Sequence, residues 1–313
     1  MNYSIKTLFV IAIGMVSIMA YAQQQPDYVF YRYNLNAFNP AAAGYDGNAV
    51  VNLNIRSQWQ GVEDAPRTQT FLASSPLSKK VGLGVSVIND QTFIEKQTAF
   101  YVDFSYKLTL DEETNLFLGL KAGGTMLDVN AGGLQAFNYT VDPLLADQST
   151  FNPNVGIGLL LSGADYFVSL STPGLLNTNR FDEVDGQVLE ATDELHLYLS
   201  GGYNIPLSQD WLFKPSVLGR YVAGAPFSAT ITAALEYSKK FEFGAAYRTD
   251  SGVSGLALIR VADWFQAGYA YDSSLRSEIN DLGSGTHEIM LRFYIPSLGN
   301  NTQDQDEKWY NQE

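Results

Sequence analysis

Cysteine is absent from the 313-residue sequence, so disulfide bonds and thiolate chemistry are excluded. Histidine is nearly absent, with only His196 and His287, which leaves few candidates for acid–base catalysis. The 19 Lys and Arg residues are outnumbered by 33 Asp and Glu, and the formal net charge is −14. Because the basic residues are spread along the chain without forming a stripe, the composition argues against a nucleic-acid partner.

Long hydrophobic runs are also missing. The apolar run at residues 8–19 is shorter than the roughly 20 residues that a membrane-spanning helix needs. Lys6 precedes this run and the sequence AYA follows it at 20–22, as in a secretory signal peptide. We therefore expect residues 1–22 to be a signal peptide cleaved before Gln23, with an uncleaved N-terminal anchor as the alternative. The lack of cysteine argues against a lipoprotein.

From residue 49 onward, segments of about ten residues alternate in polarity and end in turns, which predicts β-strands. Residues 100–108 are an example, with apolar Phe100, Val102 and Phe104 opposite polar Asp103 and Ser105. Strands of a soluble β-sandwich average about five or six residues, whereas strands that cross a bilayer need about 9–11. The predicted strands lie near 50–59, 67–75, 81–90, 97–109, 114–124, 153–162, 164–171, 193–204, 211–221, 227–238, 240–249, 252–260, 263–272 and 286–295.

The lengths of the connections support a transmembrane barrel rather than a sandwich. If the N-terminus is periplasmic, the connections after odd-numbered strands are external loops, and those after even-numbered strands are short periplasmic turns. The long connections at 125–152, 172–192 and 273–285 all follow odd-numbered strands. We therefore predict an all-β fold, an antiparallel transmembrane barrel of about 14 strands at 49–295, with a polar periplasmic tail at 296–313.

Charged residues are predicted to face the lumen of this barrel: Lys107, Lys121, Glu236, Glu242, Arg248 and Arg292. A lumen bounded by 14 strands is wider than wall side chains can fill, so water, loops or a plug must occupy it. A diffusion channel is therefore one functional possibility.

The stretch NAFNPAAAGYDGN at 36–48 precedes the first strand and has neither a strand nor a helix period. Its small residues allow close backbone packing, and Asn39-Pro40 and Gly44 favour turns. We therefore expect residues 23–48 to form an ordered periplasmic arm that tucks into the periplasmic mouth of the barrel. The alternative is a flexible leader.

Seven stretches resemble, in order, the PorP/SprF family of type IX secretion system outer-membrane proteins. They are YNLNAFNPAAAG (33–44), RSQWQGVEDAPRTQ (56–69), GLGVSVIND (82–90), LFLGLKAGG (116–124), NPNVGIGLLL (152–161), YFVSLSTPGLL (166–176) and HEIMLRFYI (287–295). The resemblance implies a cell outer-membrane protein without enzymatic activity that receives a secreted protein through its C-terminal export domain. It also implies a role in cell-surface attachment of gliding-motility type and contact with a periplasmic ring lipoprotein complex. We expect the last strand of such a barrel to end on an aromatic residue, and the chain departs from this pattern because its last strand ends on Ile295.

The tip of the first hairpin is a candidate partner-binding surface, since Trp and Arg are enriched at binding hot spots. Trp59 could instead be a membrane-girdle aromatic. The long loops are uncommon unless functional or disordered, and their apolar residues suggest a protein-binding platform. The candidate external-rim residues are Arg56, Trp59, Glu63, Asp64, Arg67, Phe137, Tyr139, Leu144, Leu175 and Leu176; the candidate arm residues are Asn39, Pro40 and Gly44.

Catalytic and metal-binding motifs are not recognisable in the sequence. An outer-membrane lipase would need a His and a Ser on one outward rim, but strand parity places His196 inside the lumen and His287 outside. The acidic clusters DEET (111–114) and DEVD (182–185) lack the spacing of a Ca²⁺ loop. We therefore expect neither a cofactor nor a bound metal.

Overall fold

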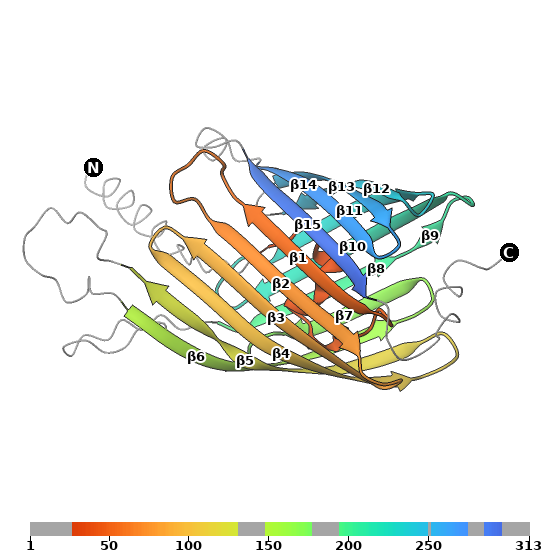
Figure 1. Ribbon diagram of the computed structural model, residues 1–313, viewed down its shortest axis with the longest axis horizontal. Coiled ribbons are helices and arrows are strands. Elements are labelled where there is room, and N and C mark those ends of the chain that lie inside the picture. Colours follow the sequence, from red (N-terminus) through yellow and green to blue (C-terminus); the bar gives the residue numbers. More distant parts are fainter. Residues whose placement is uncertain (1–26, 131–147, 177–193, 250–251, 275–284, 296–313) are drawn as a thin grey trace, which may run out of the picture.

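A computed structural model describes residues 27–130, 148–176, 194–249, 252–274 and 285–295 of the chain. The chain forms a closed antiparallel β-barrel in which each strand pairs with its neighbours in sequence and β1 pairs with β15 (Figure 1). The strands are β1 (Ala49–Ser57), β2 (Arg67–Pro76), β3 (Val81–Thr92), β4 (Glu95–Thr109), β5 (Asn115–Val129), β6 (Gln148–Ser162), β7 (Tyr166–Thr172), β8 (His196–Tyr203), β9 (Ile205–Pro206), β10 (Trp211–Val222), β11 (Ser228–Tyr237), β12 (Phe241–Arg248), β13 (Gly252–Ala262), β14 (Phe265–Ser274) and β15 (Thr286–Ile295).

These strand segments make 14 crossings, so the predicted barrel is confirmed. β8 and β9 are two parts of one crossing, because both pair with β10 and only Asn204 separates them. The hairpin of β5 and β6 extends further than predicted, and Val129 pairs with Gln148. Residues 125–129 and 148–152, predicted to lie in a loop, are therefore strand. Their backbone groups continue the same ladder of hydrogen bonds.

The described turns β2–β3, β4–β5, β6–β7, β11–β12 and β13–β14 lie at one end of the barrel, and the strand ends that flank the longer connections lie at the other (Figure 1). In outer-membrane barrels the short turns face the periplasm and the long loops face outward. We therefore call these the periplasmic end and the external end.

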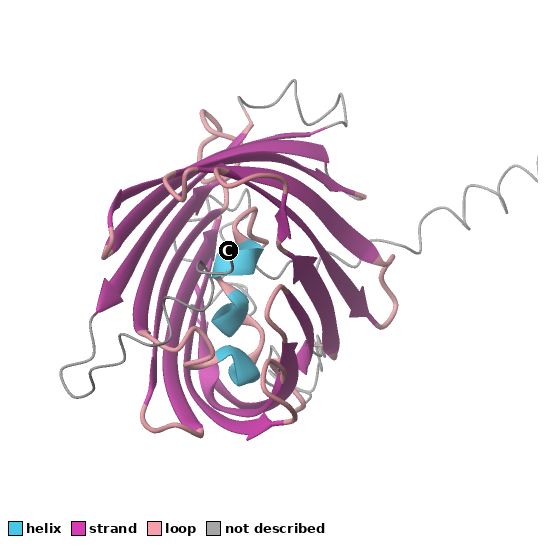
Figure 2. Cartoon of the chain, turned by 90° about the vertical axis from the view of Figure 1, so that its right-hand side faces the viewer, coloured by secondary structure: helices cyan, strands magenta, loops and turns pink. Residues whose placement is uncertain are grey.

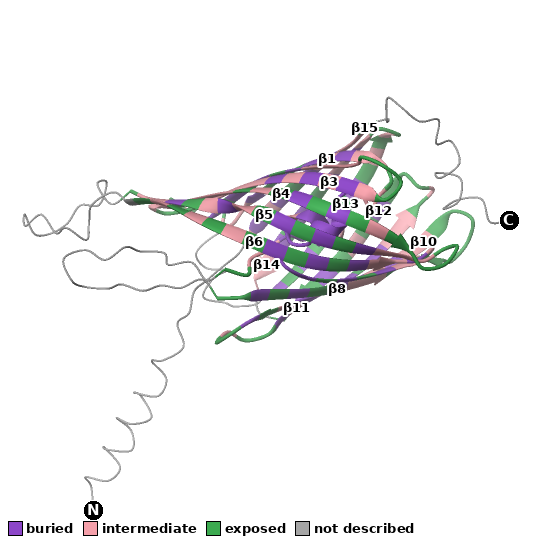
Figure 3. Cartoon of the chain, turned by 90° about the horizontal axis from the view of Figure 1, so that it is seen from below, coloured by how far each residue is buried: buried purple, intermediate pink, exposed green. Residues whose placement is uncertain are grey.

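Burial alternates along every strand, as the checkered pattern in Figure 3 shows. On β1, Asn52 and Asn54 are buried in the lumen, whereas Leu53 and Ile55 point outward and are 37% and 40% exposed. The polarity is inverted relative to a soluble protein, because the outward face meets lipid and the lumen contains the polar groups. Among the described residues, no helix is long and apolar enough to span a membrane.

Three short 3₁₀ helices lie inside the barrel: η1 (Tyr31–Tyr33), η2 (Leu35–Ala37) and η3 (Pro40–Ala42). Viewed from the periplasmic end, they form a column within the ring of strands (Figure 2). Residues 27–48, which we call the arm, therefore supply the centre of the fold.

Candidate functional site: an arm inside the lumen and an external rim

The middle of the arm is held by Asn39, whose side chain is fully buried. Its Oδ1 accepts a hydrogen bond of 2.8 Å from the Ala41 amide and thereby caps η3. Its Nδ2 donates to the carbonyl of Leu159 at 3.0 Å and to Ser169 Oγ at 2.6 Å. Pro40 occupies the first position of η3, where its missing N–H leaves no helical bond unmade. One Asn-Pro pair thus shapes the arm and fixes it to β6 and β7.

Glycines in the wall give the arm room to approach. Gly119 on β5 and Gly158 on β6 are cross-strand partners that face the lumen. A Cβ added to Gly119 would lie 2.0 Å from the Ala41 amide nitrogen, and one added to Gly158 would lie 1.9 Å from Asn39 Oδ1. On β3, a Cβ on Gly82 would lie 2.1 Å from the Ala43 carbonyl oxygen. The wall and the arm are therefore complementary in shape.

Apolar side chains of the arm form one cluster with the wall. Tyr31, Leu35 and Phe38 pack with wall residues that include Phe167 and Tyr198. The rings of Phe38 and Tyr198 stack with centroids 5.1 Å apart. A second cluster forms around Val29, Phe30, Leu256, Leu258 and Met290. This burial inside a polar lumen stabilises one docked position of the arm.

Charged groups fix the end of the arm that lies toward the external side. Asp27 carboxylate oxygens lie 3.3 Å from Arg220 Nη1 and 3.5 Å from Arg248 Nη1. Burial alone would raise the pKa of the Asp27 carboxyl, but Arg248, Arg220 and Arg56 outweigh it and lower the pKa. The Val29 amide donates to Glu288 Oε2 at 2.7 Å. This part of the arm therefore enters a lumen region where arginines and carboxylates alternate.

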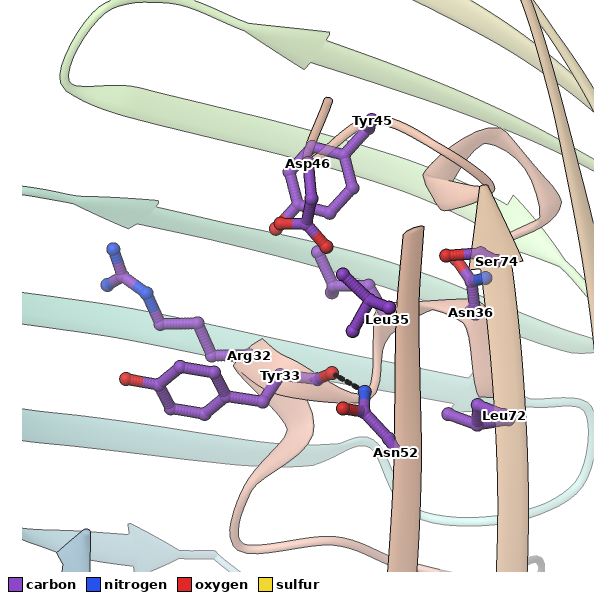
Figure 4. A pocket seen from close by; sticks show the side chains of 10 residues that line it. Arg32, Tyr33, Leu35, Asn36, Tyr45, Asp46, Asn52, Leu72 and Ser74 are labelled. Atoms are coloured by element: carbon purple, nitrogen blue, oxygen red, sulfur yellow. Dashed lines mark hydrogen bonds between the residues drawn. The ribbon is translucent and has the colours of Figure 1, made fainter. Parts of the chain in front are cut away.

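The periplasmic end of the arm is fixed by a second set of polar contacts. Tyr33 and Lys214 both hydrogen-bond Glu242, and burial together with Glu242 raises the pKa of Tyr33. Arg292 Nη2 lies 2.7 Å from an Asp46 carboxylate oxygen. Asn52 of β1 donates to the Tyr33 carbonyl at 2.6 Å, which is the dashed line in Figure 4. Both ends of the arm are thus paired with charges on the wall.

The arm lies deeper than the sequence indicated. We expected it at the periplasmic mouth, yet residues 27–46 pass through the lumen as far as Arg220 and Arg248 near the external ends of their strands. The alternative of a flexible leader is wrong for these residues, since Asn34, Asn39, Ala41 and Ala43 are each completely buried. Cavities that the described residues leave beside the arm include one of about 10 Å³ and one of about 120 Å³.

The external rim differs from prediction at Arg56. We expected Arg56 on the rim, but it is 3% exposed inside the lumen, where it pairs with Asp272 at 2.8 Å and Glu288 at 3.4 Å. The reason is strand parity, because Arg56 follows Asn52 and Asn54 on the inward face of β1.

The remaining hairpin residues lie at the external end. Glu63, Asp64 and Arg67 are exposed and Trp59 is half-buried, and both Trp59 and Asp64 have positive φ, 45° and 55°. Sequence analysis missed Phe93 on the neighbouring β3–β4 turn, which has φ 54° and is 54% exposed. Its amide donates to the Asp64 carbonyl at 3.1 Å, so the two hairpin tips form one rim.

Other rim candidates lie further around the barrel or outside the described residues. Leu175 and Leu176 are exposed after β7, where their amides donate to Asn154 Oδ1 at 2.9 and 3.0 Å. Phe137, Tyr139 and Leu144 lie outside the described residues. Gly44 has φ +71° and lies against Ser75 and Pro76 at the end of β2, where a side chain would be strained.

The two histidines lie on opposite faces of the wall. His196 is buried in the lumen, and outward His287 is paired through Nδ1 with Tyr269 Oη at 2.7 Å. In the DEET turn, Asp111 accepts from the amides of Glu113 and Thr114, and these bonds lower the pKa of its carboxyl. Within the described ranges, no group of three or more His, Cys, Asp and Glu side chains could hold a metal ion.

The fold and the occupied lumen define the class: an outer-membrane β-barrel whose N-terminal segment fills its own interior. A family model described as "Type IX secretion system membrane protein PorP/SprF" matches residues 20–293. The chain belongs to this family, and its place is the outer membrane. This is a family of secretion components rather than enzymes.

Solved structures with a similar arrangement are outer-membrane barrels of low sequence identity. The Acinetobacter baumannii outer membrane protein Omp33 is 11% identical with a TM-score of 0.46, covering 79% of this chain and 98% of its own. A Pseudomonas aeruginosa FadL homologue is 10% identical with a TM-score of 0.46, covering 87% and 95%. The CymD monoaromatic hydrocarbon channel is 10% identical with a TM-score of 0.48, covering 83% and 92%. No curated protein matches the sequence.

Proposed function

We propose that this barrel is a non-enzymatic component of the type IX secretion system that binds a secreted protein, such as an adhesin, at its external rim. Binding would involve the C-terminal export domain of that protein and would aid its export and cell-surface attachment, as in gliding motility. The periplasmic end would contact the ring lipoprotein complex of the machine. Family membership supports the setting, and the resemblance noted above supplies these partners.

The observation that carries the proposal is an exposed rim above an occupied lumen. The rim combines apolar Val62 and Phe93, exposed by 37% and 54%, with Trp59 and the charged residues Glu63 and Arg67. Apolar and aromatic anchors surrounded by polar groups are typical of protein-binding surfaces. The Phe93–Asp64 backbone bond between the two hairpin tips holds these residues on one connected surface.

Replacement of the rim anchors tests this function. We expect Val62→Ser with Phe93→Ser to reduce surface display of the secreted protein at least about 10-fold, the effect of losing roughly 1.4 kcal/mol of binding. The matched control is Leu77→Ser with Leu110→Ser, which removes exposed apolar side chains from periplasmic turns. If both double variants display the secreted protein equally, with equal amounts of barrel in the membrane, then the external rim is not the surface that binds it.

A diffusion channel is the second candidate, favoured by the charged lumen. The arm bonds to wall residues on β1, β2, β7, β10 and β15, so we expect the purified barrel to be silent in planar bilayers. Steady ion conductance by the intact chain would establish the channel instead. A deletion strain that still displays the secreted protein normally would remove the secretion role.

A further inference from the structure

A cavity of about 120 Å³ lies at the periplasmic end, beside the turn between β11 and β12. It is lined by Tyr33, Lys214, Glu236, Lys239, Lys240, Phe241, Glu242, Leu258, Arg260, Gln266 and Tyr294. Water occupies roughly 30 Å³ per molecule in the liquid. The cavity therefore has room for a side chain or a short piece of peptide, and it reaches the surface at exposed Lys240.

The lining is positively charged in a chain that is strongly acidic. It contains four basic and two acidic side chains, an excess of two positive charges, whereas the whole chain has a formal net charge of −14. Lys214 is already paired with Glu236 at 3.1 Å and with Glu242. Lys240 and Arg260 add positive charge at the outer part of the cavity, where it attracts anions.

A buried hydrogen-bond acceptor without a partner belongs to a residue that lines the same cavity. Gln266 on β14 is 4% exposed, and its Oε1 has no hydrogen-bond partner among the described residues. A buried polar atom without a partner costs about 1–3 kcal/mol, so a ligand that donates a hydrogen bond here recovers free energy. The ligand chemistry that fits both features is an anion that also carries an N–H donor.

The position of the cavity selects a peptide over a lipid headgroup. Lys214, Glu242 and Gln266 face the lumen, whereas lipid contacts the outward face of the strands. A peptide with Asp or Glu side chains has both the carboxylates and the backbone N–H groups that this lining requires.

We propose that this cavity binds an acidic peptide segment. The carboxylates of the peptide pair with Lys240 and Arg260, and one backbone N–H of the peptide donates to Gln266 Oε1. The same chemistry has two sources: a periplasmic partner, or the acidic tail QDQDEK at 303–308 of this chain, which lies outside the described residues. This acidic stretch begins nine positions after Tyr294, a residue of β15 that lines the cavity. The inference rests on the proposed function in one respect, namely that this end of the barrel faces the periplasm.

The test measures binding of a fluorescent QDQDEK peptide to the purified full-length barrel by anisotropy, with the peptide QNQNQK, which lacks carboxylate side chains, as the reference. We expect Lys240→Gln with Arg260→Gln to weaken binding about 10-fold. The control, Lys79→Gln with Lys80→Gln, removes the same charge from another periplasmic turn and should change affinity less than about twofold. Binding should also weaken from 0.1 to 1 M salt, as the screening length falls from about 10 to about 3 Å.

Two further variants complete the test. Gln266→Leu should weaken peptide binding while leaving the unfolding temperature unchanged or higher, because it removes an unpaired polar atom. Neutralising Asp304, Asp306 and Glu307 in the full chain distinguishes the sources. Tighter peptide binding in that variant identifies the chain's own tail as the occupant, and unchanged binding identifies a site for a partner.

The proposal is overturned if QNQNQK binds as tightly as QDQDEK, or if the two charge-removal pairs have equal effects. Because the assay uses a purified barrel and a synthetic peptide, such a failure is distinct from a failure of the secretion role, which is measured in cells.

Discussion

A single methyl group at residue 119 is expected to displace the arm. In Gly119→Ala, the new Cβ would lie 2.0 Å from the Ala41 amide nitrogen and 2.5 Å from the Pro40 carbonyl carbon. Ordinary contacts begin near 3.4 Å, so the arm must move by about 1.4 Å. The neighbouring atoms are backbone, which cannot rotate away, and β5 is held by pairing on both sides.

A shift of this size breaks the bonds of Asn39, which reach Ser169 at 2.6 Å and Leu159 at 3.0 Å. Each buried group left unpaired costs about 1–3 kcal/mol, so two such groups weaken docking by about 2–6 kcal/mol. The lower value already corresponds to a roughly 30-fold increase in the undocked population. Gly158→Ala should weaken docking through the same bonds, since its new Cβ would lie 1.9 Å from Asn39 Oδ1, which cannot move without breaking them.

The absence of cysteine makes the assay direct, because Ala42→Cys introduces a single thiol at a position that is 2% exposed. We expect maleimide labelling of this thiol to be slow in the otherwise native barrel and at least about 10-fold faster with Gly119→Ala. The matched control is Gly255→Ala, where nothing lies within 4 Å of the new Cβ. If Gly119→Ala and Gly255→Ala give equal labelling rates, the arm does not occupy the wall at Gly119.

Three further predictions concern the polar contacts. Arg56→Leu should destabilise the barrel by about 3–5 kcal/mol, since it removes the nearest cation from two buried carboxylates, Asp272 and Glu288. Exposed Arg67→Leu should change stability by less than about 0.5 kcal/mol, and thermal unfolding measured by circular dichroism compares the two variants. Asn39→Ala should increase hydrogen exchange throughout η3 by removing its cap, whereas unchanged protection would show that the cap is dispensable. Docking lowers the pKa of Asp27, so its ion pairs stabilise docking at higher pH and are lost as pH falls through the docked pKa. The hydrogen-exchange protection factors of the arm, corrected for the intrinsic rate at each pH, should therefore fall on acidification, and Asp27→Asn should abolish this step.

The barrel was predictable because its signals are local. Alternation with a period of two marks each strand, and connection length distinguishes the two ends; neither requires knowledge of distant contacts. The same parity rule placed Lys121 and Arg292 inside the lumen, where both are buried. Sequence analysis missed the extra length of β5 and β6. The added residues keep the backbone hydrogen bonds of the hairpin but lack the strong apolar alternation that marks a strand in the sequence.

The rim was predictable only in part. Its exposed charges follow from a polar hairpin tip, but Arg56 belongs to the strand below and its role follows from parity rather than from its neighbours in sequence. Phe93 joins the rim through a backbone bond to Asp64, 29 positions earlier, and no local pattern announces such a pairing.

The sequence by itself determined the class of fold and the number of strand crossings, because each depends on patterns within a few residues. Only the tertiary structure decided what fills the lumen. Asn39 meets Ser169 across 130 residues, and Ala41 fits against Gly119 because several strands bring that surface together. Such complementarity exists only after the wall has closed, and for that reason an arm expected at the mouth is found inside the barrel.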